Sequence, residues 1–293
     1  MISILEALTW GEQTLKKTAH EKCTDVHNAK LDAQVLLSAC LQKSTAYLFS
    51  HAGDEIPQEK FDAYQRFIER RSHHEPVAYI LGEQPFLGRS FFVNTSVLIP
   101  RPETELLAQY AIDLANPQSI LCDIGTGSGA IAISFSGETN LPALGCEISP
   151  MALRVAKQNA KHHKLDHLVS FLEGHLLQPL LTHLPAKDRH LILTANLPYL
   201  PARRKTAIDP DVYHFEPHVA LFGGLDGLDL YHELFSQLAD ARPALPDRIH
   251  LLIEIDPIQA RSAPVLLKAL FPHAQIDVLD DLSKKPRILS AQI

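Results

Sequence analysis

A carboxamide and a phenol lie close together in the stretch "LILTANLPYLP", residues 191–201. Asn196 follows an apolar run of the kind that forms a buried strand, and Tyr199 comes soon after it. A side-chain amide offers one acceptor oxygen and two donor hydrogens, and the carbonyl of Leu197 offers a second acceptor. Together these groups can hold both hydrogens of a substrate NH2 group. This fixes the direction in which its nitrogen can attack an electrophilic carbon.

The rest of this tetrapeptide suits the same chemistry. Pro198 biases the residue before it toward extended backbone, which keeps the Leu197 carbonyl pointed in one direction. Tyr199 can pack over a planar substrate or face a cationic centre. We therefore predict a catalytic role for Asn196, Leu197, Pro198 and Tyr199. Position 197 is expected to contribute its carbonyl rather than its side chain, so that proline would be tolerated there. Taken alone, the stretch could also be an ordinary strand-end turn.

A glycine-rich turn, "GTGSGA" at residues 125–130, follows an apolar strand that ends in Asp123. Glycines allow tight turns and close approach to a ligand, and the carboxyl end of the first strand is where such sheets bind ligands. Glu147 ends the next strand, where a carboxylate can hold both hydroxyls of a ribose. The spacing is GxGxG rather than the dinucleotide pattern GxGxxG. This favours S-adenosylmethionine, which has no phosphate, over NAD.

These residues need a scaffold, and the hydrophobic pattern predicts one. Residues 1–75 show helical spacing and are expected to form a small N-terminal domain that recognises the substrate. Residues 76–100 predict a β-hairpin linker, with strands at 91–93 and 97–99 around an Asn-Thr-Ser turn. Residues 101–293 alternate between apolar strands and helices. This alternation predicts an α/β fold with a doubly wound, mostly parallel sheet.

Composition limits the remaining possibilities. The chain has 293 residues, and 46% of them are hydrophobic. Its net charge of -7 argues against a protein whose main function is to bind nucleic acid. Neither a signal peptide nor a membrane span is expected. Cys23, Cys40, Cys122 and Cys146 lack metal spacing, and the last two lie in apolar runs as reduced core thiols, which favours a cytoplasmic location.

Sixteen histidines raise the possibility of a metal site. They include the adjacent pairs His73–His74 and His162–His163, but adjacent helical residues do not face one site. No metal is therefore expected. A basic cluster of Arg203, Arg204 and Lys205 follows the tetrapeptide and is either a solvated loop or a contact for an acidic partner.

The motifs together resemble a known family. "GTGSG", Glu147 and "NLPY" are similar to the methyltransferases of amino groups that carry Asn-Pro-Pro-Tyr. "EPVAYILGEQPFLGRSFFV", "VLIPRPETELL", "EPHVALFGGLDGLDLYHELF" and the segment 253–259 resemble one branch, the HemK family of release factor N5-glutamine methyltransferases. The resemblance covers nearly the whole chain and implies a class I methyltransferase fold, which is Rossmann-like.

The resemblance also implies roles. The reaction would transfer a methyl group from S-adenosylmethionine to the glutamine amide of the Gly-Gly-Gln motif of class I release factors. Arg101, Pro102 and Glu103 would shape the substrate-side wall, together with residues 196–199. The cofactor would contact Asp123, Gly125, Thr126, Gly127, Ser128, Gly129, Glu147, His175, Leu176 and Asn196.

The chain departs from the family at three places. Leu197 replaces a proline, His175 and Leu176 stand where an aspartate and an aromatic residue are usual, and Asp256 stands where glycine is frequent.

Three alternative functions remain open. One is methylation of glutamine on a ribosomal protein, and another is methylation of adenine N6 in nucleic acid, because an Asn-x-Pro-Tyr site suits any NH2 group. The third is a cofactor-binding scaffold without activity, which the changes at His175 and Leu176 suggest. No membrane partner and no direct nucleic-acid substrate are expected.

Overall fold

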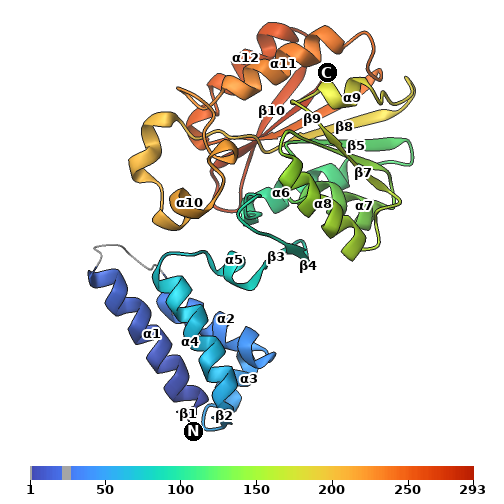
Figure 1. Ribbon diagram of the computed structural model, residues 1–293. Coiled ribbons are helices and arrows are strands. Elements are labelled where there is room, and N and C mark those ends of the chain that lie inside the picture. Colours follow the sequence, from blue (N-terminus) through green and yellow to red (C-terminus); the bar gives the residue numbers. More distant parts are fainter. Residues whose placement is uncertain (1, 22–27) are drawn as a thin grey trace. The chain divides into compact units, whose positions relative to one another are not determined.

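The sheet predicted for the C-terminal part is present in the computed structural model of the chain (Figure 1). The structure describes residues 2–21 and 28–293, except for the side chains of residues 18–21 and 205–207. Cys23 and the Lys205 side chain therefore lie outside the described part. The described residues form two compact units. One is the chain up to Glu83 together with Ile208–Phe215, and the other comprises Gln84–Ala207 and Glu216–Ile293.

The second unit contains a seven-stranded sheet in the described part of the chain, in the order β10-β11-β9-β8-β5-β6-β7. Neighbouring strands from β9 to β7 run parallel, β11 is antiparallel to β9, and β10 is antiparallel to β11. The strands are β5 (Ser119–Ile124), β6 (Ala143–Glu147), β7 (Val169–Glu173), β8 (His190–Ala195), β9 (Arg248–Glu254), β10 (Gln275–Asp280) and β11 (Pro286–Gln292). The prediction of a doubly wound, mostly parallel sheet is confirmed.

Helices cover both faces of this sheet (Figure 1). Successive strand residues point to opposite faces, so Leu121 packs with one helical layer and Cys122 with the other. The first layer contains α6 (Pro102–Asp113), α7 (Ala130–Thr139) and α8 (Pro150–His162), and the second contains α9 (Gln178–Leu181), α11 (Asp229–Ala241) and α12 (Ser262–Leu270). Burial on both faces explains why the strands are almost continuously apolar.

The strand register brings three chain segments to one edge of the sheet. Ile124 pairs with Ala195, and Ala195 pairs with Ile253. The glycine-rich turn, Asn196 and Glu254 therefore leave the sheet side by side, at the carboxyl ends of β5, β8 and β9. This is the edge at which open α/β sheets bind ligands.

The predicted hairpin is present, and the strand predicted at residues 91–93 overlaps one of its strands, but the partner strand precedes it in the chain and does not lie at residues 97–99. The paired strands are β3 (Glu83–Phe86) and β4 (Arg89–Phe92), joined by Leu87 and Gly88, which both have positive φ. Two positive φ values match the twist of a tight hairpin turn. Residues 97–99 form no strand. Their apolar pattern instead reflects the burial of Val97 and Ile99 in irregular backbone.

Helices build the first unit around its own core. They are α1 (Ile4–Glu21), α2 (Ala29–Leu41), α3 (Thr45–Ser50), α4 (Gln58–Ser72), α5 (Val77–Leu81) and α10 (Pro210–Phe215), with a short strand pair of β1 (Ile2–Ser3) and β2 (Glu55–Ile56). Arg71 is buried and pairs with Asp32 at 2.7 Å and with Asp211 at 2.9 Å. Asp211 lies on α10, so this ion pair holds the returning segment within the unit.

Candidate active site

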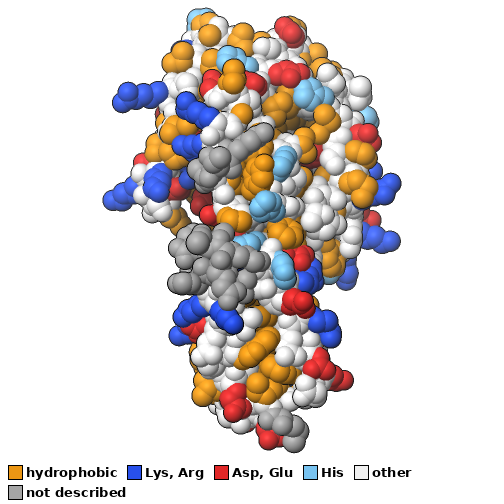
Figure 2. All heavy atoms as spheres, turned by 60° about the vertical axis from the view of Figure 1, so that its left-hand side comes forward, with side chains coloured by type: hydrophobic (Ala, Val, Ile, Leu, Met, Phe, Trp, Pro, Cys, Tyr) orange, Lys and Arg blue, Asp and Glu red, His pale blue; other side chains and the backbone are white. Residues whose placement is uncertain are grey.

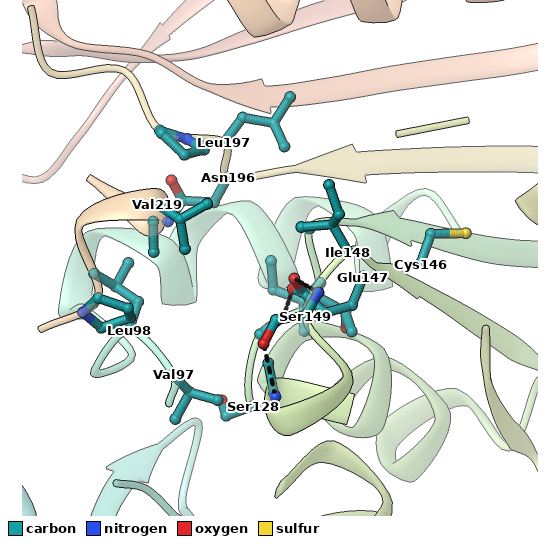
Figure 3. A pocket seen from close by; sticks show the side chains of 18 of the residues that line it. Val97, Leu98, Ser128, Cys146, Glu147, Ile148, Ser149, Asn196, Leu197 and Val219 are labelled. Carbon is teal, nitrogen blue, oxygen red and sulfur yellow. Dashed lines mark hydrogen bonds between the residues drawn. The ribbon is translucent and has the colours of Figure 1, made fainter. Parts of the chain in front are cut away.

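A cavity of about 280 Å³ opens at the carboxyl edge of the sheet (Figure 3). It brings together most of the residues predicted from the sequence: Arg101, Gly125, Thr126, Gly127, Ser128, Glu147, His175, Leu176, Asn196, Leu197 and Pro198. Five predicted residues do not line it: Pro102, Glu103, Asp123, Gly129 and Tyr199. Most of the lining is apolar, so the few polar groups determine how a ligand would be oriented.

Glu147 is held in place by the backbone on both sides of it. Its Oε2 accepts the Gly127 N–H at 3.0 Å, and its Oε1 accepts the Ser149 N–H at 3.0 Å (Figure 3). A carboxylate has about four acceptor positions, and these two bonds leave the others available. The side chain therefore presents a preoriented anion with free acceptor capacity, which fits a pair of sugar hydroxyls.

The glycine-rich turn packs against the tetrapeptide that carries the amide. Gly125 has a φ of +72°, and a Cβ atom there would lie 2.9 Å from Cδ2 of Leu197. A side chain at position 125 would therefore require both unfavourable backbone and displacement of Leu197. This close approach keeps the start of the turn next to Asn196.

Asp123 supports the turn from below rather than reaching the cavity. Its carboxylate is buried and accepts hydrogen bonds from the hydroxyls of Thr126 at 2.6 Å and Thr194 at 2.8 Å. Burial raises the pKa of this carboxyl group to about 7, although the two hydroxyl bonds oppose the shift. Asp123 thus fixes Thr126 in the turn, which differs from the predicted direct contact with a cofactor.

Asn196 belongs to a chain of polar groups that sequence reasoning did not find. Its Nδ2 donates to the Thr104 hydroxyl at 2.9 Å, and this hydroxyl donates to Oε2 of Glu254 at 2.7 Å. Oε1 of Glu254 accepts the Tyr199 hydroxyl at 3.0 Å. Burial raises the pKa of Glu254 and that of Tyr199 above their ordinary values. Tyr199 therefore points toward Glu254 and does not line the cavity.

The expectation for Leu197 was wrong in part. Its backbone N–H donates to the Tyr231 hydroxyl at 3.2 Å, and the Tyr231 hydroxyl donates in turn to the Glu254 carbonyl. The Leu197 side chain is also buried, against Gly125. Position 197 consequently uses its amide and its side chain, and proline would lose the first of these contacts.

Residues far along the chain hold the backbone of the tetrapeptide. A Cβ atom at Gly223 would lie 2.1 Å from the Pro198 carbonyl oxygen, and one at Gly227 would lie 1.9 Å from the Tyr199 carbonyl oxygen. Gln259 Nε2 donates to the same Tyr199 oxygen at 3.2 Å. The sequence analysis assigns no role to either glycine. Their place in the stretch "EPHVALFGGLDGLDLYHELF" was the available signal.

An ion pair connects two segments that line the cavity. Arg101 pairs with Glu216, whose side chain is fully buried and also accepts the Ile99 N–H at 3.1 Å. Leu98 and Val219 come from these two segments and face the cavity near Asn196 (Figure 3). Glu216 thus fixes the wall that was assigned to the substrate.

Two departures from the family pattern have partners of their own. His175 Nε2 lies 2.8 Å from Oε1 of Glu233, so a carboxylate from α11 stands beside the position where an aspartate is usual. Asp256 caps the short helix η3 (Pro257–Gln259) and pairs with Arg204 at 2.8 Å. Arg204 of the basic cluster is therefore engaged within the unit.

Other features of the described residues complete the picture. Their His, Cys, Asp and Glu side chains form no group of three that could hold a metal ion. No helix within residues 2–21 and 28–293 is long and apolar enough to span a bilayer. Cys122 and Cys146 are buried free thiols, as predicted. A mixed exterior of charged, histidine and apolar side chains is visible on the face in Figure 2.

Comparison with known proteins identifies the family of the chain. Residues 6–82 match the PrmC N-terminal domain, and residues 115–198 match a methyltransferase domain. The release factor glutamine methyltransferase of Bacillus anthracis is 33% identical over 296 residues, which cover 99% of each chain. The chain belongs to this family. The family's protein from Bacillus subtilis (strain 168) is 32% identical over 100% of this chain and 99% of its own.

A solved structure shares the fold. The N-terminal domain of human METTL16 in complex with SAH superposes with a TM-score of 0.52 and 14% identity, over 88% of this chain and 93% of the other. At this identity the likeness extends to the fold alone. It agrees with the class I methyltransferase architecture expected for a member of the release factor glutamine methyltransferase family.

Proposed function

We propose that this chain transfers a methyl group from S-adenosylmethionine to the side-chain amide nitrogen of the glutamine in the Gly-Gly-Gln motif of class I release factors. Membership of the release factor glutamine methyltransferase family over the full length supports the substrate. The juxtaposition of the glycine-rich turn, Glu147 and Asn196 around one cavity is the observation that carries the proposal.

The residues present fit S-adenosylmethionine. Glu147 would hold the ribose hydroxyls with the acceptor positions that its two backbone bonds leave free. The turn from Gly125 to Ser128 would follow the cofactor closely, and Leu176 would provide apolar contact on the adenine side, with His175 beside it. The bound cofactor supplies an electrophilic methyl carbon attached to a sulfonium.

Asn196 and Leu197 would orient the nucleophile. The Nδ2 of Asn196 donates a hydrogen bond to Thr104, which leaves the Oδ1 as an acceptor for one substrate N–H. The Leu197 carbonyl would accept the second N–H. An amide nitrogen is a poor nucleophile because its lone pair is delocalised, so holding both hydrogens contributes by fixing the direction of attack. Tyr199 would support this arrangement through Glu254 rather than by stacking on the substrate.

Three further assignments accompany this function. The helical unit would recognise the protein substrate, because the residues that line the cavity all belong to the other unit. Arg101 would shape the substrate-side wall, with Pro102 and Glu103 beginning the helix behind it. A cytoplasmic location agrees with the free thiols of Cys122 and Cys146.

The test is mass spectrometry of the Gly-Gly-Gln peptide after incubation of the full chain with S-adenosylmethionine and a purified release factor. One added methyl group on the glutamine side chain is expected. Asn196→Ala should lower turnover about 10²–10³-fold, by analogy with the loss of one preorganised hydrogen-bonding group. Methylation of a ribosomal protein or of nucleic acid in parallel reactions, with an unmodified release factor, would overturn the proposal.

A further inference from the structure

A carboxylate at the end of β9 is almost completely withdrawn from solvent, yet it accepts two hydroxyl hydrogen bonds. Glu254 is 1% exposed, and its partners are Thr104 from the first turn of α6 and Tyr199 from the tetrapeptide. Burying a carboxyl group costs free energy, and its hydrogen bonds offset part of that cost. The bonds of Glu254 lead directly to the amide that lines the cavity.

We propose that Thr104 and Glu254 are positioning residues that determine which end of the Asn196 amide faces the substrate. The inference rests on the proposed methyl transfer to an NH2 group and deepens it. An amide can rotate by half a turn and exchange its oxygen for its NH2 at nearly the same shape. For recognition of a substrate NH2 group, the oxygen has to face the cavity, because an NH2 group of Asn196 would offer donors to donors.

The direction of the hydrogen bonds follows from the chemistry of Glu254. Oε2 of Glu254 acts as an acceptor, so the Thr104 hydroxyl donates its single hydrogen to it at 2.7 Å. That hydroxyl then has only lone pairs left for its other neighbour. Asn196 must consequently present Nδ2 to Thr104, which it does at 2.9 Å, and Oδ1 is directed elsewhere. The order of donors and acceptors is thus set at Glu254 and transmitted through one hydroxyl.

The second oxygen of Glu254 extends the same control to Tyr199. The phenol donates to Oε1 at 3.0 Å and so fixes the side chain that ends the tetrapeptide. Two of the four tetrapeptide residues are therefore oriented from one buried carboxylate. The Glu254 backbone carbonyl adds a third connection, because it accepts the Tyr231 hydroxyl that receives the Leu197 N–H.

The neighbouring strands explain how one residue can reach all these groups. β8 and β9 are parallel and adjacent, so Asn196 and Glu254 leave the sheet together. Thr104 lies on the first turn of α6, which packs over both strands, and it also lines the cavity. The arrangement forms a relay from the buried carboxylate to the cavity, defined as Glu254, Thr104 and Asn196.

Three substitutions test the relay. Thr104→Val keeps the shape but removes the hydroxyl, Thr104→Ser keeps the hydroxyl, and Glu254→Gln keeps the shape but adds a donor that can reverse the relay. Single-turnover methylation of a Gly-Gly-Gln release factor should fall roughly a hundredfold in the valine and glutamine variants, the loss expected for a misdirected nucleophile. The serine variant should retain most of the wild-type rate.

Two measurements separate orientation from general damage. The affinity for S-adenosylhomocysteine should stay close to wild type in Thr104→Ser and Thr104→Val. The midpoint of thermal unfolding should stay close to wild type in Thr104→Ser but fall in Thr104→Val, because valine leaves a buried oxygen of Glu254 without its donor. The side-chain amide signals of 15N-labelled Asn196 should shift in Thr104→Val and be restored in Thr104→Ser. Wild-type rates in both Thr104→Val and Glu254→Gln would overturn the inference. Absence of glutamine methylation by the wild-type chain would instead overturn the proposed function, and unchanged Asn196 amide signals in Thr104→Val would overturn the relay independently of activity.

Discussion

Arg101 and Glu216, which are 115 residues apart in the chain, form an ion pair whose carboxylate is completely buried. The same carboxylate accepts the Ile99 N–H, so it joins the segment before α6 to the segment that carries Val219. Neither segment is part of the sheet or of a long helix. Their relative position therefore depends on this one side chain more than on regular secondary structure.

Removal of the Glu216 carboxylate should destabilise the second unit. Glu216→Ala leaves the Ile99 N–H without its acceptor, and an unsatisfied buried donor costs about 1–3 kcal/mol. Urea unfolding should show a loss of this size, and the Michaelis constant for the release factor should rise because the cavity wall loosens. Asp240→Asn, an exposed acidic position on α11, is the matched control and should unfold like the wild type. Equal stability of the Glu216 and Asp240 variants would contradict the role of the ion pair.

The amide of Leu197 leads to a second prediction. Leu197→Pro removes the N–H that donates to Tyr231, and Tyr231→Phe removes the hydroxyl that accepts it. Each variant should therefore lose about 0.5–1.5 kcal/mol of unfolding free energy. Leu197→Met keeps the N–H and a flexible apolar side chain, and should be close to neutral. The three variants are compared by urea denaturation. A proline variant as stable and as active as the methionine variant would restore the view that position 197 supplies its carbonyl alone.

Cofactor affinity should depend on Glu147. Charge-assisted hydrogen bonds to ribose hydroxyls contribute roughly 1.5–3 kcal/mol each, so Glu147→Ala should weaken S-adenosylhomocysteine binding about tenfold or more in calorimetry. Glu173 lies opposite Glu147 in the register of the neighbouring strand β7, and its side chain is exposed. Glu173→Ala is therefore a suitable control. If both variants bind with wild-type affinity, the ribose assignment is wrong.

Acid should destabilise the chain through a histidine at the opposite end of β8. Burial lowers the pKa of His190 to about 4 from 6.5, with the neighbouring His250 adding to the shift. Between pH 6.5 and about 4, the unfolded chain therefore binds more protons than the folded chain. The contribution of His190 to the unfolding free energy is complete above about pH 6.5 and is lost as the pH falls toward 4. His190→Gln should flatten the pH dependence of urea unfolding in this window, whereas exposed His167→Gln should not. Parallel pH curves for wild type and His190→Gln would refute this prediction.

Much of the sheet could be predicted because its strands are buried on both faces and read as short apolar runs. The place of the glycine-rich turn, Glu147 and Asn196 at one edge of the sheet could be predicted for the same reason, since each directly follows one of these runs. The hairpin was misplaced because Val97 and Ile99 are buried in irregular backbone, which periodicity cannot distinguish from a strand. Local sequence patterns predict the helices and strands but not the loops that pack on them.

The relay escaped prediction for a different reason. Thr104 and Glu254 are 150 residues apart, and each looks ordinary in its own segment: a threonine in a helical first turn and a glutamate at a strand end. Their meeting depends on the strand order, which places β9 beside β8, and on the helix that crosses both. The position of Asp123 below the turn escaped prediction for a related reason, because sequence position alone does not tell whether a strand-end carboxylate points into the cavity or beneath the turn.

The return of Ile208–Phe215 to the helical unit has a practical consequence for engineering. The chain changes unit after Glu83, again before Ile208, and once more after Phe215, so a single cut does not separate two independent modules. A fragment beginning at residue 84 would carry α10 without Arg71 and the rest of the helical unit, and would leave Asp211 without its ion-pair partner. Chimaeras that exchange the helical unit between relatives therefore have to exchange both of its segments together.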